Sequence, residues 1–200
     1  MSRLQSLWRR LLREDAGTVT VEFMLMTPLL AFAMVGILVF FDAQRTQSID
    51  LKAALTIADV VSRERDVVGD TYVDGLYELQ KFVNLHDKTP TLRVTLVRYH
   101  LKDEETETQD VTPHFHVVWS EVRGNGQAPH TDATVSGYTP RLPVMGNGDR
   151  LILVETWTDY EQPIDVGLRN DGFSTFTFAS PRHVKVCFNN APDDATQDIC

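Results

Sequence analysis

Three histidines have the residue type and spacing that could bind a metal ion. His114 and His116 are two residues apart in an alternating segment, so a strand there would place both imidazoles on one face. His100 lies in the segment predicted to pair with that strand. However, no cysteine or acidic residue stands at the spacing that zinc sites use. We therefore predict polar strand residues and no metal site, with a metal-dependent enzyme as the alternative.

Acidic residues cluster at two places where oxygen ligands could gather around calcium. One cluster comprises Asp103–Glu105 with Glu107, and the other comprises Asp193 and Asp194. Neither cluster has the central glycine and ligand spacing of a calcium-binding EF-hand loop. Solvated turns are therefore the expected structure at both places.

The sequence lacks the motifs of the common catalytic and cofactor sites. The glycine-rich segments 124–126 and 146–148 are not followed by a helix, as a phosphate-binding loop would be. No Gly-x-Ser-x-Gly motif occurs, and Cys187 lacks the neighbours of a thiol protease nucleophile. We predict no enzymatic activity and no cofactor.

The charge distribution argues against binding to nucleic acid. The chain has a net charge of −9. Four arginines face two acidic residues within positions 1–17, so the remaining chain is at −11, two units more negative than the whole. A body of that charge repels phosphates. The same arginines bear on membrane orientation.

An apolar segment, Phe23–Phe41, predicts a membrane-spanning helix. Its 19 residues contain no charge, and such a helix would be about 28 Å long, close to the bilayer core. Because the arginines precede it, the N-terminus is expected in the cytoplasm and the chain after Phe41 in the periplasm. No small-x-small cleavage site ends the segment, which argues against a signal peptide. The alternative is the buried core helix of a soluble protein.

A short motif precedes the apolar segment: Gly17, then Glu22 five residues later, after a charged leader. A glycine lets the backbone lie flat in a protease cleft, and the motif resembles the processing site of type IV prepilins. The stretch from Glu14 to Pro28-Leu29-Leu30 resembles TadE/TadF-type pseudopilins of the Flp, or tight-adherence, type IVb pilus system. A weaker similarity recurs at Ser180-Pro181-Arg182 and Cys187.

That resemblance implies cleavage between Gly17 and Thr18 by a prepilin peptidase, and a role for Glu22 in registering one subunit against another. It also implies a pilin-like fold and partners in the inner membrane, namely other pilins and the assembly platform. Pilins usually have Phe or Met after the cut, and Thr18 departs from that pattern. From spacing alone, Glu22 could equally rest among lipid headgroups, and the chain could be an unprocessed, membrane-tethered periplasmic binding module.

Hydrophobic periodicity predicts the remaining elements. One helix is expected from Thr18 to near Val61, with Asp50 and other charged residues on its polar side, and a second within 73–83. Alternation then predicts strands. They are placed at residues 92–97, 115–119, 151–160 and 184–188, with a long irregular excursion over 123–148.

The predicted fold is therefore α+β, with a long N-terminal helix packed on a small antiparallel sheet. The domains are a leader (1–17, cleaved), a transmembrane helix (18–41), a stalk with a second helix (42–89) and a periplasmic β domain (90–200). In an oxidising periplasm Cys187 and Cys200 are expected to form a disulfide, with two free thiols as the alternative.

Overall fold

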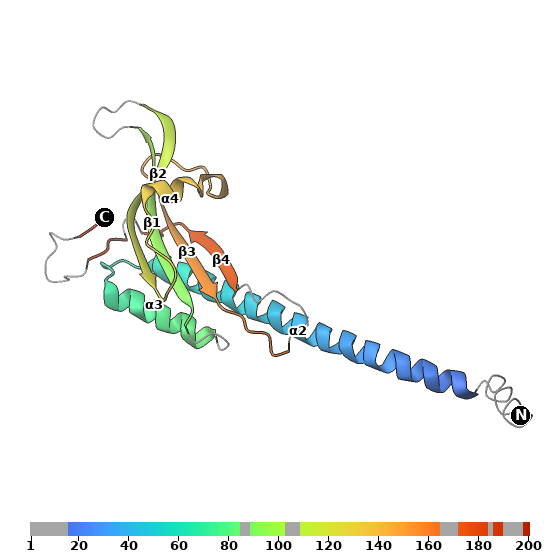
Figure 1. The fold of residues 1–200 in the computed structure, drawn as a ribbon. Helices are drawn as coiled ribbons and strands as arrows, with labels where there is room; N and C mark the ends of the chain where they lie inside the picture. Colours follow the sequence, from blue (N-terminus) through green and yellow to red (C-terminus); the bar gives the residue numbers. More distant parts are fainter. Residues whose placement is uncertain (1–15, 85–88, 103–108, 165–171, 184–185, 190–197) are drawn as a thin grey trace, which may run out of the picture. The chain divides into compact units, whose positions relative to one another are not determined.

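The computed structural model describes residues 16–84, 89–102, 109–164, 172–183, 186–189 and 198–200. It combines one long helix with a four-stranded sheet, which confirms the α+β class (Figure 1). The elements in chain order are α2 (Ala16–Arg63), α3 (Asp70–Val83), β1 (Thr91–Lys102), β2 (Gln109–Arg123), α4 (Asp132–Ser136), the 3-10 helix η1 (Thr139–Arg141), β3 (Arg150–Thr158) and β4 (Phe173–Ala179).

The chain divides into two compact units, and the boundary falls inside α2. One unit comprises residues 1–44 and 162–168, and the other comprises residues 45–161 and 169–200. The second unit therefore contains the C-terminal part of α2 together with α3 and the whole sheet. We call it the sheet domain.

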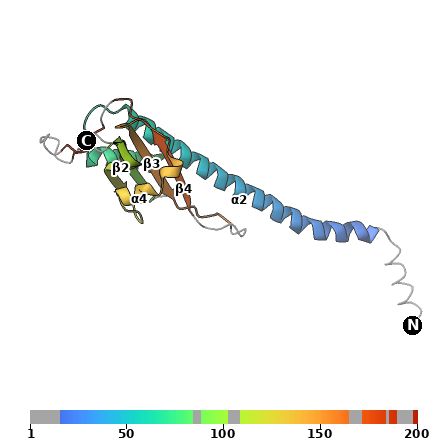
Figure 2. The same ribbon diagram turned by 90° about the horizontal axis from the view of Figure 1, so that it is seen from above.

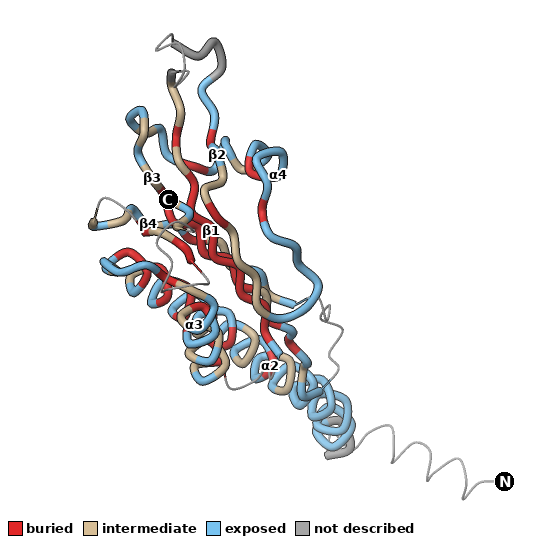
Figure 3. Tube along the Cα trace, turned by 90° about the vertical axis from the view of Figure 1, so that its left-hand side faces the viewer, coloured by how far each residue is buried: buried red, intermediate tan, exposed pale blue. Residues whose placement is uncertain are grey.

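The sheet is antiparallel throughout, in the order β2-β1-β3-β4. The central strands β1 and β3 are buried along most of their length, as the tube coloured by burial shows (Figure 3). Strands rich in Val, Leu and Ile, such as 151–154, suit this position because both of their faces are covered. The predicted pairing of the first two strands is confirmed.

Helices α2 and α3 cover one face of the sheet. Ala54, Ile57 and Val61 of α2 pack with Val73 of α3 onto the sheet residues Leu92–Leu96 and their neighbours. Figure 2 shows α2 on one side of the sheet and α4 on the other, and Figure 3 shows α3 on the same side as α2. The three- and four-residue spacing that predicted an amphipathic second half of the long helix therefore corresponds to a buried face.

The segment 124–149 covers the opposite face of the sheet. It includes α4 and η1, so the excursion predicted to be irregular contains two short helical turns. Val135 and Leu142 from this segment are buried against Leu153 and Phe115. The capping box between Thr131 and Thr134, which starts α4, has Thr at its third position where Glu or Gln is usual. That substitution explains why the sequence pattern did not reveal the helix.

The fourth strand lies elsewhere than predicted. We expected it at 184–188, but β4 is Phe173–Ala179, which pairs with β3 from Ile152↔Ala179 to Thr158↔Phe173. Residues 184 and 185 lie outside the described residues. Phe188 forms only isolated bridges, to Val68 and Ile199. The alternation of Phe with Ser and Thr in β4 is that of a half-covered strand, and it outweighs the shorter apolar run near Val186.

Candidate functional site

The N-terminal half of α2 is apolar and exposed. Phe23, Leu30 and Phe41 are 70%, 66% and 65% exposed, and most large apolar side chains between them are exposed as well. Water-exposed surfaces rarely carry a continuous apolar segment of this kind. Among the described residues this is the one helix long and apolar enough to cross a membrane, which agrees with a single span.

The polar features within this segment are compatible with a lipid environment. The Thr27 hydroxyl donates to the Phe23 carbonyl at 2.6 Å, so its hydrogen bond is made within the helix. Pro28 lies inside the helix and removes one backbone hydrogen bond, a loss that membrane helices tolerate. A Cβ at Gly36 would meet no atom within 4 Å, so this glycine does not mark a close approach within the chain.

The predicted processing residues lie at the start of α2. Gly17 and Thr18 are helical, and the Thr18 side chain is not among those described. Residues 1–15 of the leader also lie outside the described residues. Glu22 is exposed. Thr18 and Glu22 are four residues apart in one helix, so they share a face.

Asp50 occupies a position that the sequence did not predict. We expected it on the polar side of the helix, but it is fully buried between α2 and the sheet. Its carboxylate accepts hydrogen bonds from the hydroxyls of Thr156, Thr158 and Thr175, at 2.7 to 2.8 Å. A buried carboxylate is costly unless such donors surround it. Asp50 therefore fixes how α2 sits on β3 and β4.

The C-terminal segment is attached to the end of α2. The Arg182 N–H donates to the Ser62 carbonyl, one of the last carbonyls of the helix, and its guanidinium pairs with Asp59 at 2.7 Å. The sulfurs of Cys187 and Cys200 are 2.09 Å apart, in agreement with the predicted disulfide. Val68 accepts from and donates to the same segment, which joins the disulfide loop to the link between α2 and α3.

The three histidines singled out in the sequence do come together. His100 stacks on His114, with 5.7 Å between ring centroids, and meets His116 edge-on at 5.9 Å. The His116 ring also bonds to Asp132 of α4 at 2.9 Å. Within the described ranges no group of three His, Cys, Asp or Glu side chains could hold a metal ion. The acidic clusters at 103–107 and 193–194 lie outside the described residues.

A buried ionic cluster joins the sheet to segment 124–149, and no sequence pattern predicted it. Glu155 of β3 accepts from Arg93 of β1 at 2.6 Å and bonds to His130 at 2.8 Å. The Arg93 guanidinium also lies over the Trp157 ring at 4.9 Å and donates to the Ala128 carbonyl. Burial alone would raise the pKa of Glu155, but the bonds from His130 and Arg93 outweigh it and lower that pKa to about 2.

This cluster is explained by folding alone. Every member has its partner inside the domain, so the group holds the excursion against the sheet without requiring a ligand. The pair arises from the register of β1 against β3, which places Arg93 opposite Glu155. A sequence prediction of this pair would have required that register to be known.

No protein-family model matches the chain, and a search of curated proteins found no match. The geometry described above is therefore the basis for any functional assignment.

Proposed function

We propose that this chain is a minor pilin or pseudopilin, anchored in the inner membrane, that takes part in building or priming a Flp-type (type IVb) pilus and hence in surface adhesion. Its partners would be the inner membrane, a prepilin peptidase, other pilins or pseudopilins and the assembly platform. The observation that carries the proposal is helix α2. It begins with an exposed apolar segment beside a single carboxylate and ends as the core helix of a small disulfide-closed domain.

The electrostatics of the helix start support cleavage after Gly17. Cutting there would place a new ammonium group at Thr18, where the unpaired N–H groups of the helix already carry partial positive charge. A carboxylate one turn along offsets both charges. Glu22 stands at that position and is exposed, so its carboxylate could also reach the amine of a neighbouring subunit.

The same carboxylate gives a reason for subunits to associate in the membrane. A charge at membrane depth costs about 2.5–3.5 kcal/mol on insertion scales. Pairing Glu22 with an ammonium would recover part of that cost, and the apolar residues of α2 would pack against neighbouring helices. The helix would then act as both anchor and assembly surface.

The sheet domain supports export to the periplasm. Disulfides persist in oxidising compartments and are rare in the cytosol, and the Cys187–Cys200 bond closes the C-terminal segment. With the basic leader on the cytoplasmic side, this gives a single-pass protein with a periplasmic C-terminal domain. The alternative function is an unprocessed, membrane-tethered periplasmic binding module, which the same anchor and domain would serve.

Maturation of the native protein separates the two functions. In cells with an active prepilin peptidase, the purified protein should begin at Thr18 by N-terminal sequencing. Gly17→Ala should block the cut, so that the protein keeps a leader of roughly two kilodaltons. Gly36→Ala is the matched control, since that glycine lies in the same helix in open space and should mature normally.

A native protein that begins at Met1 in such cells would refute the pilin proposal and leave the tethered binding module. Equal maturation of the Gly17→Ala and Gly36→Ala variants would refute the cleavage position.

A further inference from the structure

Two arginines face each other across the central strands of the sheet. Arg150 begins β3 and lies opposite Arg98 of β1 in the antiparallel register. It precedes the fully buried Ile152 by two residues, so it shares the helix-covered face of the sheet. Like charges placed directly opposite each other on neighbouring strands destabilise a sheet. Folding alone therefore does not account for this pair.

The guanidinium of Arg150 is partly removed from water without an internal acceptor. Its Nη1 atom is buried, and no residue of the described chain accepts a hydrogen bond from it. The pKa of Arg150 lies below its ordinary value, because burial disfavours the charged form and Arg98 repels it. Buried donors of this kind usually have a partner.

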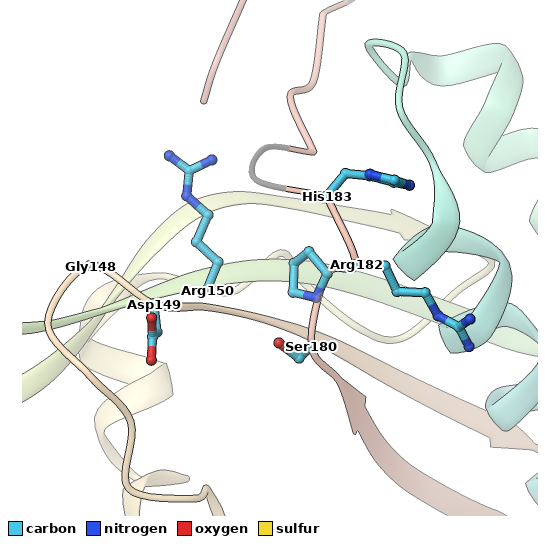
Figure 4. Close-up of a pocket in the computed structure, with 7 residues that line it drawn as sticks. Gly148, Asp149, Arg150, Ser180, Arg182 and His183 are labelled. Atoms are coloured by element: carbon cyan, nitrogen blue, oxygen red, sulfur yellow. The ribbon is translucent and has the colours of Figure 1, made fainter.

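The adjacent Asp149 does not serve as that partner. Its carboxylate accepts from the Gly146 N–H at 2.8 Å. Figure 4 shows the Asp149 carboxylate and the Arg150 guanidinium on opposite sides of the strand.

Arg150 lines a pocket of about 340 Å³ between the start of β3 and the segment after β4 (Figure 4). Two other side chains at its wall are already engaged: Arg182 pairs with Asp59 at 2.7 Å, and His183 accepts a hydrogen bond from the Arg65 Nε at 3.1 Å. Among the described lining residues, Arg150 is thus the cation that a ligand can engage. Ser180, which is exposed at the wall, adds a hydroxyl within the same pocket.

We propose that this pocket binds a carboxylate side chain of an acidic peptide segment from another protein, with Arg150 as the bidentate donor. The inference is independent of the pilin proposal, because it concerns the sheet domain and needs neither leader cleavage nor helix assembly.

The chemistry of the pocket favours a carboxylate of a peptide over other anions. A guanidinium presents parallel N–H donors that match the two oxygens of a carboxylate. The net charge of the chain, −9, opposes a dianion such as phosphate more strongly than a singly charged carboxylate. Exposed residues, Ser180 and Arg182, form part of the wall, so a side chain projecting from a peptide can enter from solvent.

The test is calorimetric titration of the full chain in zwitterionic detergent with a capped tetra-glutamate peptide. Tetra-glutamine, sodium acetate and inorganic phosphate serve as comparison ligands. Arg150→Gln should weaken peptide binding at least about tenfold. The matched control is Arg141→Gln, which removes the same charge from the exposed Arg141 in segment 124–149 and should leave binding unchanged.

A folding readout separates a ligand role from a structural one. Because Arg150 faces Arg98 and its Nη1 atom has no internal acceptor, Arg150→Gln should unfold at the same temperature as the parent or higher. If that variant is unstable, Arg150→Lys serves in its place. It keeps the positive charge without the paired N–H donors of the guanidinium and should still bind the peptide more weakly than the parent.

Three results would overturn the proposal. They are absent binding of tetra-glutamate to the parent protein, equal binding by the parent and the Arg150 variants, and tighter binding of acetate or phosphate than of the peptide. The last result would identify a site for small free anions instead.

Discussion

Acidification should destabilise the sheet domain through Glu155. The carboxyl has a pKa of about 2 in the folded protein, against an ordinary value of 4.5. A lowered folded pKa contributes stability above the unfolded pKa, and that contribution is lost as pH falls from about 4.5 through about 2. A shift of this size corresponds to about 3 kcal/mol, and Glu155 is only 3% exposed, so solvent screens it little. About 2 kcal/mol of it should be lost between pH 6 and pH 3.

The Glu155→Gln variant isolates this contribution. At pH 6 it should be less stable than the parent by about 3–5 kcal/mol, because Arg93 keeps its buried charge without a counter-charge. As pH falls to 3, the difference in free energy of unfolding between the two proteins should narrow by about 2 kcal/mol. The parent then loses the stabilisation from the Glu155 charge, which the variant lacks at every pH. Glu78→Gln, on the exposed surface of α3, is the control and should follow the parent at every pH.

Guanidinium chloride unfolding of the full chain in detergent, at fixed ionic strength, would measure these differences. Tryptophan fluorescence is a suitable probe, because Trp157 packs on Arg93 within the cluster and Trp119 lies in the core. A gap between parent and Glu155→Gln that stays constant from pH 6 to pH 3 would show that Glu155 titrates normally, and the argument from its hydrogen bonds would be wrong.

Two further predictions concern how the domain is held together. Asp50→Ala should destabilise it by about 3 kcal/mol or more, because the hydroxyls of the buried Thr156 and Thr158 and of the partly buried Thr175 lose their acceptor. Asp59→Ala, on the exposed side of the same helix, should have a much smaller effect by denaturant titration. Reducing the Cys187–Cys200 disulfide should cost about 3 kcal/mol and lower the melting temperature in calorimetry. A Cys187→Ser/Cys200→Ser variant should not respond to the reductant, and an equal response in both proteins would count against a structural disulfide.

Most of the elements followed from local pattern. The charge-free run and the three- and four-residue spacing after it predicted a helix from Thr18 to near Val61, and α2 runs from Ala16 to Arg63. The alternation near Leu92–Leu96 predicted a strand that became β1. These predictions succeed because the backbone itself sets the helix and strand periods. The burial of one face therefore produces a hydrophobic pattern among residues that are close in the sequence.

The misses share a different cause. The hydrophobic periodicity of the long helix predicted that Asp50 lies on its polar side. Only the register of β3 and β4 brings three threonines to the Asp50 carboxylate. The fourth strand was expected at 184–188 but is Phe173–Ala179, because pairing with β3 decides which apolar segment joins the sheet. Arg93, Glu155 and His130 likewise meet only after distant segments fold together.

The sequence by itself determined the apolar helix, its basic leader, the cysteine pair and the α+β class, because composition and period act over short stretches of chain. The tertiary structure decided which polar groups are buried and with what partners, and it brought Arg150 opposite Arg98 beside the pocket. Such pairings depend on strand register and on contacts between residues far apart in the chain, and no local pattern encodes these.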